Sequence, residues 1–361
     1  MKVALLDPGL VDTAGHHADV DLRIAQAFVA KGVEPIVYAN SKITAACLEM
    51  FHDSKIQIEG LFQVGAYRRP WYNLNEKFSI WMVARNILTS LKHIPRADLW
   101  LWPTLTLHQF IATQWLQKQQ FMIGCAWFDA DMGYRCGTAA WTASTRRAHS
   151  EFALVTFDAP STQHYSGITS GVSPRQLPVP FDGGPEKADR KPGITIGFFG
   201  SHRGERGGDI LRRLVEAIKA RGWQVRAQNN EGFPDVGVKD CVVIPPFVPD
   251  LAREMLRCDI VVWPSDPVKY RNKSSGIVFQ AIACGLPIVV PSNCRPRLML
   301  NDFGLQYPGF NEASVPQILF AIERTFARLE HYRQMAAKAA ERWREQHGTA
   351  RFVDSILALS N

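Results

Sequence analysis

Three consecutive segments decide the fold: KVALLD at residues 2–7, ADVDLRIAQAFVAK at residues 18–31 and VEPIVY at residues 33–38. The first and the third are short and apolar, which is typical of buried strands. The second carries apolar residues at helical spacing and is followed by Gly32, a residue type that commonly ends helices. A strand, a helix and a strand within 38 residues predict a βαβ unit and therefore a parallel sheet.

The alternation continues on both sides of a polar segment, DGGPEKADRKP at residues 182–192, whose two Gly and two Pro are typical of a linker. Before it lie predicted strands at 99–102, 121–128 and 154–157 and a predicted helix at 139–151. After it come predicted strands at 194–200, 223–227, 259–263 and 287–291, and helices at 209–221, 276–284, 315–329, 331–346 and 349–359.

This pattern predicts an α/β protein with two Rossmann-like, doubly wound parallel-sheet domains that face a cleft. We expect a first domain at residues 1–183, a linker at 184–193, a second domain at 194–345, and a helix at 346–361 that packs back on the first domain. Ligands are expected in the crevice at the carboxyl ends of the strands.

The composition excludes several classes of protein. With 46% hydrophobic and 21% charged residues, the chain is globular and not disordered. No run of 18 or more residues lacks polar or helix-breaking residues, and no signal peptide is expected at the N-terminus, so a membrane-spanning or secreted protein is not predicted. The seven cysteines form no C-x-x-C pair, which argues against a disulfide framework or a structural zinc site and fits a cytoplasmic location.

The net charge of +7 is unevenly distributed. Residues 1–183 contain 16 Lys and Arg against 15 Asp and Glu, whereas residues 184–361 contain 25 against 19. A basic second half suits a polyanionic ligand such as a nucleoside diphosphate, or an anionic surface. Nucleic acid is not the expected partner, because the chain has no compact Lys/Arg block and no zinc-finger pattern.

The segment GSHRGERGG at residues 200–208 lies between a predicted strand and a predicted helix. Its glycines allow the backbone to approach a ligand closely, and the helix N-terminus offers free N–H groups to an anion. Arg203 and Arg206 could each donate forked hydrogen bonds to phosphate. The alternative is an ordinary loop with solvated arginines.

A second polar loop, at residues 264–275, leads directly into the predicted helix that begins at Gly276. It contains Lys273 and places Ser274 and Ser275 near the helix cap, where hydroxyl and backbone N–H groups converge. Gln280 is the one polar residue in an otherwise apolar helix, so we expect it to have a hydrogen-bond partner. The alternative is a capped helix with Gln280 on its surface.

Three motifs in the second half carry a resemblance to a known family: VIPPFVPD at residues 243–250, CDIVVWPS at 258–265 and SGIVFQAIACGLPIVVP at 275–291. In this order they resemble the donor domain of GT-B glycosyltransferases, and more closely glycosyltransferase family four, whose members are retaining and use nucleotide sugars. The resemblance is strong over residues 194–345 and weaker over 1–183.

The resemblance implies roles for particular residues. Arg203 and Arg206 would hold the donor diphosphate, Gln280 would reach the ribose hydroxyls, and the Phe247–Val248 segment would line the base pocket. The family usually has two glutamates where this chain has Asn272 and Gln280. The predicted donor-binding residues are Gly15, Gly200, Ser201, Arg203, Arg206, Phe247, Val248, Asn272, Ser274, Ser275, Gly276 and Gln280.

The predicted catalytic residues are His16, Asp129 and Lys273. His16 and His17 follow the first strand, where they could bind phosphate or move a proton, or else lie exposed in a capping turn. Asp129 follows a predicted strand, where it could orient an acceptor hydroxyl or form a turn. No metal site is predicted, since two adjacent histidines have no further ligands nearby.

Aromatic and basic residues alternate in the segment at residues 67–85. Such a segment could lie at a membrane interface and reach a lipid-linked acceptor. The alternative, which we favour, is a helix that packs into the core.

From the residues and the resemblance together we predict a retaining glycosyltransferase of polysaccharide biosynthesis. It would move a sugar from a UDP- or GDP-sugar to a glycan or lipid-linked saccharide. The nucleotide sugar would be a substrate, no cofactor is expected, and the enzyme would work in the cytoplasm with a peripheral contact to the inner face of the membrane. The alternatives are a non-catalytic GT-B-like subunit that binds a nucleotide or glycan, and a nucleotide-sugar epimerase.

Overall fold

The structure is a computed structural model of the 361-residue chain. It describes residues 1–13, 17–64, 76–116, 120–126, 152–168, 173–184, 192–200, 202, 204–229, 241–245, 247–248, 250–271 and 273–360. The helix predicted at residues 139–151 lies outside these ranges.

The chain forms two compact units. The first comprises Met1–Pro180 and Thr349–Asn361, and the second comprises Phe181–Gly348. The chain therefore passes into the second unit slightly before the predicted linker, because Gly183 packs closely on the Ala283 carbonyl, where an added Cβ would lie 2.8 Å from the oxygen. The C-terminal helix, α14 (Thr349–Ser360), belongs to the first unit, where its Asp354 pairs with Lys31.

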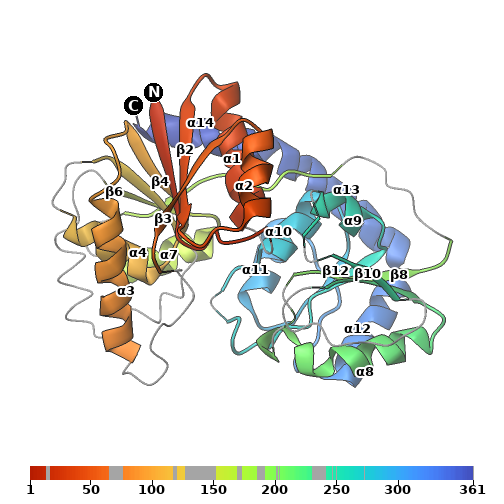
Figure 1. Ribbon diagram of the computed structural model, residues 1–361. Helices are drawn as coiled ribbons and strands as arrows, with labels where there is room; N and C mark the ends of the chain where they lie inside the picture. The colour runs from red at the N-terminus through yellow and green to blue at the C-terminus, as the bar shows by residue number, and fades with distance from the viewer. Residues whose placement is uncertain are drawn as a thin grey trace. The chain divides into compact units, whose positions relative to one another are not determined.

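The first unit contains a seven-stranded parallel sheet in the order β3-β2-β1-β4-β5-β6-β7 (Figure 1). Its strands are β1 (Lys2–Asp7), β2 (Glu34–Asn40), β3 (Gln57–Phe62), β4 (Leu99–Leu105), β5 (Met122–Ala126), β6 (Phe152–Thr156) and β7 (Arg175–Gln176). Its helices, besides α14, are α1 (His17–Ala30), α2 (Ala45–Asp53), α3 (Glu76–Leu91), α4 (Leu107–Trp115) and α7 (Ala159–Ile168).

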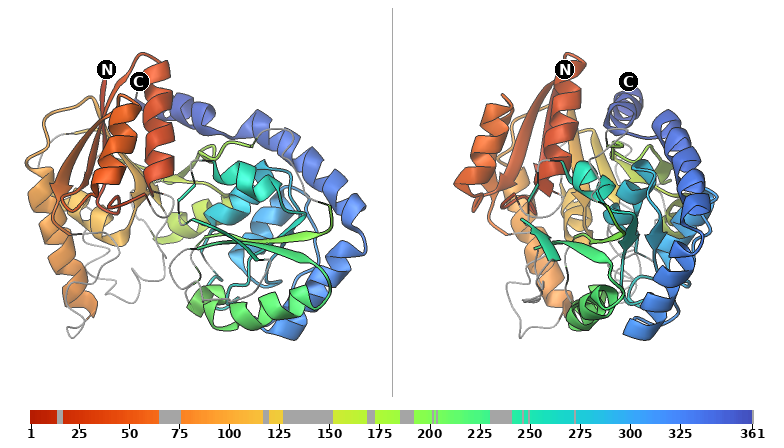
Figure 2. Two further views of the ribbon diagram at one scale, coloured as in Figure 1. Left: turned by 45° about the vertical axis from the view of Figure 1, so that its right-hand side comes forward. Right: turned by 90° about the vertical axis from the view of Figure 1, so that its right-hand side faces the viewer.

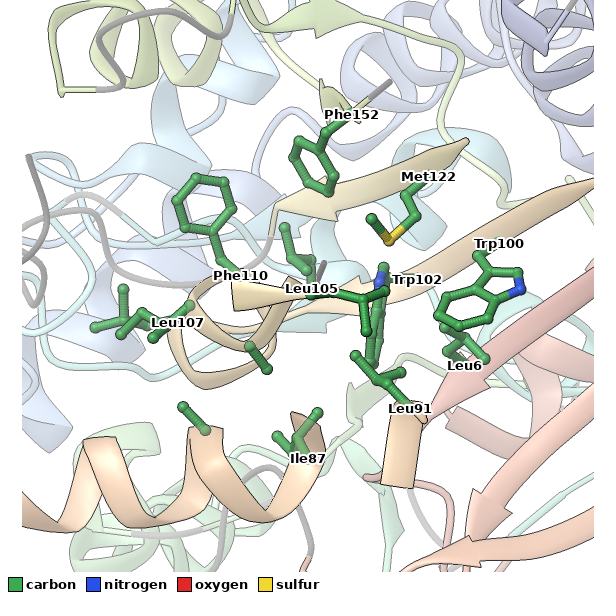
Figure 3. Close-up of a cluster of buried hydrophobic side chains, with 14 of the residues drawn as sticks. Leu6, Ile87, Leu91, Trp100, Trp102, Leu105, Leu107, Phe110, Met122 and Phe152 are labelled. Carbon is green, nitrogen blue, oxygen red and sulfur yellow. The ribbon is translucent and has the colours of Figure 1, made fainter. Parts of the chain in front are cut away.

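One hydrophobic core cluster of the first unit lies between β4 and the helices α3 and α4 (Figure 3). Trp100 and Trp102 of β4 are fully buried together with Leu91 of α3 and Met122 of β5. Burying one indole removes about 200 Å² from water, which at about 25 cal/mol per Å² is worth roughly 5 kcal/mol. Every residue of β4 is buried, as expected for a strand of a parallel sheet that is covered on both faces.

Helix α3 contains the second part of the aromatic and basic segment at residues 67–85. Residues 67–75 lie outside the described ranges, but Ile80 and Val83 are buried in the core, and Trp81 stacks on Trp115 of α4 at 4.8 Å between ring centroids. From Ile80 onward the segment is therefore a core-packing helix. None of the described helices combines the length and the apolar character needed to cross a bilayer.

The second unit contains a five-stranded parallel sheet in the order β10-β9-β8-β11-β12. Its strands are β8 (Thr195–Phe198), β9 (Gln224–Gln228), β10 (Cys241–Ile244), β11 (Ile260–Val262) and β12 (Ile288–Val289). Its helices are η1 (Gly204–Arg206, a 3₁₀ turn), α8 (Gly208–Lys219), α9 (Leu251–Leu256), α10 (Gly276–Ala283), α11 (Arg295–Asp302), α12 (Val315–Phe326) and α13 (Leu329–Gln346). Helices α8 and α12 lie side by side on one face of the sheet (Figures 1 and 2).

Each sheet reverses its strand order at one point, between β1 and β4 in the first unit and between β8 and β11 in the second. The prediction of two doubly wound parallel-sheet domains is thus confirmed. Loops that follow strands on opposite sides of a reversal diverge and leave a crevice at the carboxyl edge of the sheet, which is where α/β folds bind ligands. The reversals therefore identify the loops after β1, β4, β8 and β11 as the places to look for a site.

Candidate functional site

The loop after β8 begins with a left-handed glycine, Gly200, at φ +84°. Its backbone N–H donates to Gln228 Oε1 at 2.9 Å, and His202 Nε2 contacts the Gln228 backbone oxygen at 2.9 Å. A carbonyl oxygen only accepts, so Nε2 carries the proton in this contact. Burial, together with the charge of Arg206, lowers the pKa of His202 to about 4 even though this hydrogen bond opposes the shift. His202 is thus a neutral anchor of the loop and not a cation for phosphate.

Gly207 joins this loop to α8 and packs directly against the loop after β11. Its φ is +77°, and an added Cβ would lie 2.4 Å from the Pro264 carbonyl oxygen. Asp266 N–H donates to the Glu205 carbonyl at 3.0 Å nearby. The two loops therefore meet backbone to backbone at the reversal of the sheet, and only glycine fits at position 207.

Two predicted site residues, Arg206 and Lys273, come together around one aromatic ring. Arg206 Nε donates to the Tyr270 hydroxyl at 2.5 Å, and its guanidinium carbon lies 5.7 Å from the ring centroid. Lys273 Nζ lies 5.9 Å from the same centroid. Among the residues that the structure describes, neither cation is paired with a carboxylate. The arrangement gathers positive charge that no described acidic side chain neutralises.

The N-terminus of α10 lies beside these loops. Ser275 is the N-cap, with extended backbone and no hydrogen bond from its side chain to the first turn, and it is buried. An added Cβ on Gly200 would lie 3.2 Å from Ile277 in that turn, so the helix start adjoins the first loop. The structure thus brings the predicted residues Gly200, Ser275 and Gly276 to one place, where α10 presents the positive end of its dipole.

Gln280 has the partner that its sequence context predicted, but it does not lie on an exposed face. The side chain is 2% exposed, and Nε2 donates to the Asp182 carbonyl at 2.8 Å and approaches Cys284 Sγ at 3.5 Å. Its amide therefore ties α10 to the segment that enters the unit. The alternative of a Gln280 on the surface of the helix is therefore wrong, and its role at a ribose stays a prediction.

The Gln280 contact makes a testable prediction. A Gln280→Glu variant should lose about 1–3 kcal/mol of stability at neutral pH, because an ionised carboxylate cannot donate to the Asp182 carbonyl. A buried glutamate has a raised pKa, so its relative stability is greatest below the unfolded value near 4.3 and falls as pH rises through the folded pKa. Thermal unfolding between pH 4 and 8 measures this, with exposed Gln334→Glu as the control. Unchanged stability with tighter nucleotide binding would instead restore the ribose role.

The remaining predicted donor residues divide into two groups. Phe247 and Val248 follow β10, two strands away from β8, and both are half-buried; Ser274 is likewise half-buried. Their roles stay predictions. The other predicted site residues, which are Gly15, His16, Asp129, Ser201, Arg203 and Asn272, lie outside the described residues.

In the first unit, a buried ionisable cluster lies at the carboxyl end of β1. His17 Nδ1 lies 2.6 Å from Asp7 Oδ2, the Gly9 N–H donates to Asp7 Oδ1 at 2.7 Å, and Asp21 is fully buried one turn after His17. His17 is therefore not an exposed residue of a capping turn, and its role toward phosphate or a proton stays a prediction. The sequence signal for the pair is an aspartate that ends a strand and a histidine that starts the next helix.

The ionisation of this cluster follows from its contacts. Burial raises the pKa of Asp7, but the charge and hydrogen bond of His17, with the hydrogen bond from the Gly9 N–H, outweigh it, so the net pKa is lowered. Burial lowers the pKa of His17, yet the charge and hydrogen bond of Asp7 raise it above its ordinary value. Burial and the charge of Asp7 both raise the pKa of Asp21. The cluster thus favours a charged Asp7–His17 pair beside a protonated Asp21.

No family model and no curated protein matches the sequence. Among solved structures, the chain is similar over its whole length to sucrose-phosphate synthase from Thermosynechococcus elongatus, at 12% identity and a TM-score of 0.66, covering 99% of this chain and 98% of that one. The chain has the GT-B fold.

Two further GT-B neighbours cover the chain as fully. Anabaena HepE, solved in complex with UDP and glucose, is 12% identical with a TM-score of 0.66, and 99% of each chain is covered. The calicheamicin glycosyltransferase CalG4 is 14% identical with a TM-score of 0.62, covering 99% of this chain and 97% of that one. These neighbours establish the GT-B architecture.

Proposed function

We propose that the protein is a retaining glycosyltransferase that moves a sugar from a UDP- or GDP-sugar to a saccharide or lipid-linked acceptor. The observation that carries the proposal is the pairing of Arg206 and Lys273 around Tyr270, beside the first turn of α10. A nucleoside diphosphate requires concentrated positive charge with directed N–H donors, and these loops supply both. The GT-B fold, shared with a protein solved with UDP and glucose, supports the same class of donor.

The proposed chemistry depends on stabilising the leaving group. When the bond between the anomeric carbon and the diphosphate breaks, negative charge develops on the departing oxygen. The Arg206 guanidinium can donate a fork of hydrogen bonds to it, Lys273 adds a mobile point charge, and the α10 N–H groups complete the cradle. We propose that these groups supply the charge neutralisation that a divalent cation otherwise provides, so that the nucleotide sugar is a substrate and no cofactor takes part.

Retention is proposed from the family-four character of the motifs in the second unit, and it requires no strong protein base. The Asp7–His17 pair favours a second mechanism, inversion, because a carboxylate that orients an imidazole is a general-base arrangement once the imidazole has lost its proton above its raised pKa. The anomeric configuration of the product, read by proton NMR, distinguishes the two. An inverted product that depends on His17 would replace retention by direct displacement.

A non-catalytic binding role is the remaining candidate. It is favoured by Asn272 and Gln280, which stand where the family usually has glutamates. It is also favoured by the hydrogen bond that Gln280 donates to the Asp182 carbonyl. Hydrolysis or transfer of a bound nucleotide sugar by the purified protein would exclude it. We further propose that the enzyme acts in the cytoplasm, with the lipid-linked acceptor bringing it to the inner face of the membrane.

The test of donor binding is a thermal-shift screen against UDP, GDP, ADP, CMP and their sugar conjugates. A ligand at 100 times its Kd that binds only the folded state adds about 2.7 kcal/mol of stability, which is a clear rise in Tm. We expect a selective rise with one nucleoside diphosphate, and none with the matching nucleoside, which lacks the phosphates. No rise with any diphosphate would contradict the proposed donor site.

A further inference from the structure

Tyr270 is not among the residues that the resemblance singles out, yet its side chain is buried and contacts both loops. It is 4% exposed, and its ring packs edge-on against Trp263 at 4.6 Å between centroids. Its backbone N–H donates to the Asp266 carbonyl and its own carbonyl accepts from Arg295 N–H, both at 3.1 Å. Trp263, which follows β11, therefore holds the ring, while hydrogen bonds to its own loop and to the start of α11 hold the backbone of Tyr270.

The Tyr270 side chain contacts cations through both its hydroxyl group and the π-face of its ring. The hydroxyl oxygen accepts from Arg206 Nε at 2.5 Å, and the ring has the Arg206 guanidinium at 5.7 Å and the Lys273 ammonium at 5.9 Å from its centroid. Two cations that share one neighbour would otherwise repel each other and turn toward water. A phenol offers each of them a negative partner without adding the full charge that would neutralise them.

The contact also decides which N–H groups of the guanidinium remain available to a ligand. Because Nε is used by Tyr270, the two terminal NH₂ groups of Arg206 keep their fork for a ligand, and Nη1 already lies toward Gly200, 3.5 Å from where a Cβ on that glycine would be. Fixing the guanidinium beforehand lowers the entropy lost when a diphosphate binds.

We propose that Tyr270 is a positioning residue that sets Arg206, and through its ring Lys273, for a diphosphate bound at the loops after β8 and β11. The inference rests on the proposed function, because it assigns these cations to the donor diphosphate. It predicts that the Tyr270 hydroxyl contributes to the affinity for diphosphate and contributes nothing to the affinity for the nucleoside portion.

The experiment compares Tyr270→Phe with Tyr307→Phe by calorimetric titration of UDP, GDP and inorganic pyrophosphate. Tyr307 is a matched control, since it is a tyrosine of the same unit, equally buried at 4%, whose hydroxyl has no hydrogen-bond partner among the described residues. Tyr270→Phe keeps the ring and removes the acceptor. We expect it to weaken diphosphate and pyrophosphate binding about tenfold, because the Arg206 side chain would then have to be ordered when the ligand binds. Tyr307→Phe should bind them like the wild type.

A double-mutant cycle separates positioning from general structural support. If Tyr270 acts through Arg206, Tyr270→Phe should cost almost nothing further in an Arg206→Ala background. Equal losses in both backgrounds, or wild-type affinity in Tyr270→Phe, would overturn the inference while leaving the donor site in place. A wild-type protein that binds neither UDP, GDP nor pyrophosphate would overturn the inference together with the proposed function.

Discussion

An Arg206→Ala variant is expected to bind its nucleoside diphosphate well over tenfold more weakly than the wild type. Arg206 is half-buried, is bonded to the Tyr270 hydroxyl and has no carboxylate partner among the described residues, so its charge is available to a ligand. A bidentate guanidinium–phosphate contact at such a site combines two charge-assisted hydrogen bonds, and losing both exceeds the tenfold that about 1.4 kcal/mol represents. Isothermal titration with the diphosphate found in the thermal-shift screen measures the change directly.

Two further variants make this result interpretable. Arg206→Lys keeps a positive charge but has no planar fork and no Nε to donate to Tyr270, so its affinity should lie between those of the wild type and the alanine variant. Arg213→Ala removes an exposed arginine of α8 in the same unit and should leave the affinity unchanged. Unaltered affinity in Arg206→Ala would remove Arg206 from the donor site and with it the assignment of these loops.

If the protein is an enzyme, the kinetic effect has a further signature. Charge on the diphosphate grows as the donor bond breaks, so Arg206 should contribute more to the transition state than to the bound ground state. Arg206→Ala should therefore lower kcat as well as raise KM for the nucleotide sugar. A rise in KM alone would indicate that the arginine only anchors the donor.

Much of the fold could be predicted from local pattern alone. The run at residues 2–7, the helix after it and the next strand are found as β1, α1 and β2, since each shows the apolar spacing of its element and ends at a breaker. Strand β3 and helix α2 were not predicted. Strand β3 has a mixed pattern in which Glu59 and Gly60 are exposed, so its apolar residues are too few to reveal it before its pairing with β2 is known.

The candidate site was only partly predictable, and the reason is distance along the chain. Arg206 was recognisable because a glycine-rich loop between strand and helix is a local signal. Its contact with Tyr270 joins residues 64 positions apart, and that of Gln280 with Asp182 joins residues 98 apart. No spacing rule relates such pairs, because packing of the sheet brings them together. The sequence could thus show that Gln280 needed a partner without showing which one it has.

The second large effect is expected from Asp7→Asn, which should destabilise the protein by about 3 kcal/mol near pH 5–6. Asp7 is fully buried and is bonded to both His17 and the Gly9 N–H. Asparagine keeps the shape but loses the charge that stabilises a protonated imidazole. A buried pair that loses one partner leaves the other uncompensated, which costs much more than losing an exposed pair.

The pH dependence follows from the direction of each pKa shift. The pKa of His17 is raised above 6.5, so its contribution is fully present below 6.5 and is lost as pH rises through the folded pKa. The pKa of Asp7 is lowered below 3.8, so its contribution is present above 3.8 and is lost as pH falls through the folded pKa. The pair therefore contributes most between about pH 4 and 6.5, and the difference between wild type and Asp7→Asn should shrink on either side.

The raised pKa of Asp21 also changes the expected pH dependence of stability. Its pKa is raised by burial and by the charge of Asp7, so wild-type stability falls as pH rises above 3.8. In Asp7→Asn that charge is gone and part of this loss should disappear, which brings the two stability curves together at high pH. Urea unfolding from pH 4 to 9 gives both curves, and Asp98→Asn, at an exposed carboxylate that accepts the Lys2 N–H, is the matched control. If Asp7→Asn and Asp98→Asn gave parallel curves, the Asp7–His17 pair would not be charged in the folded protein.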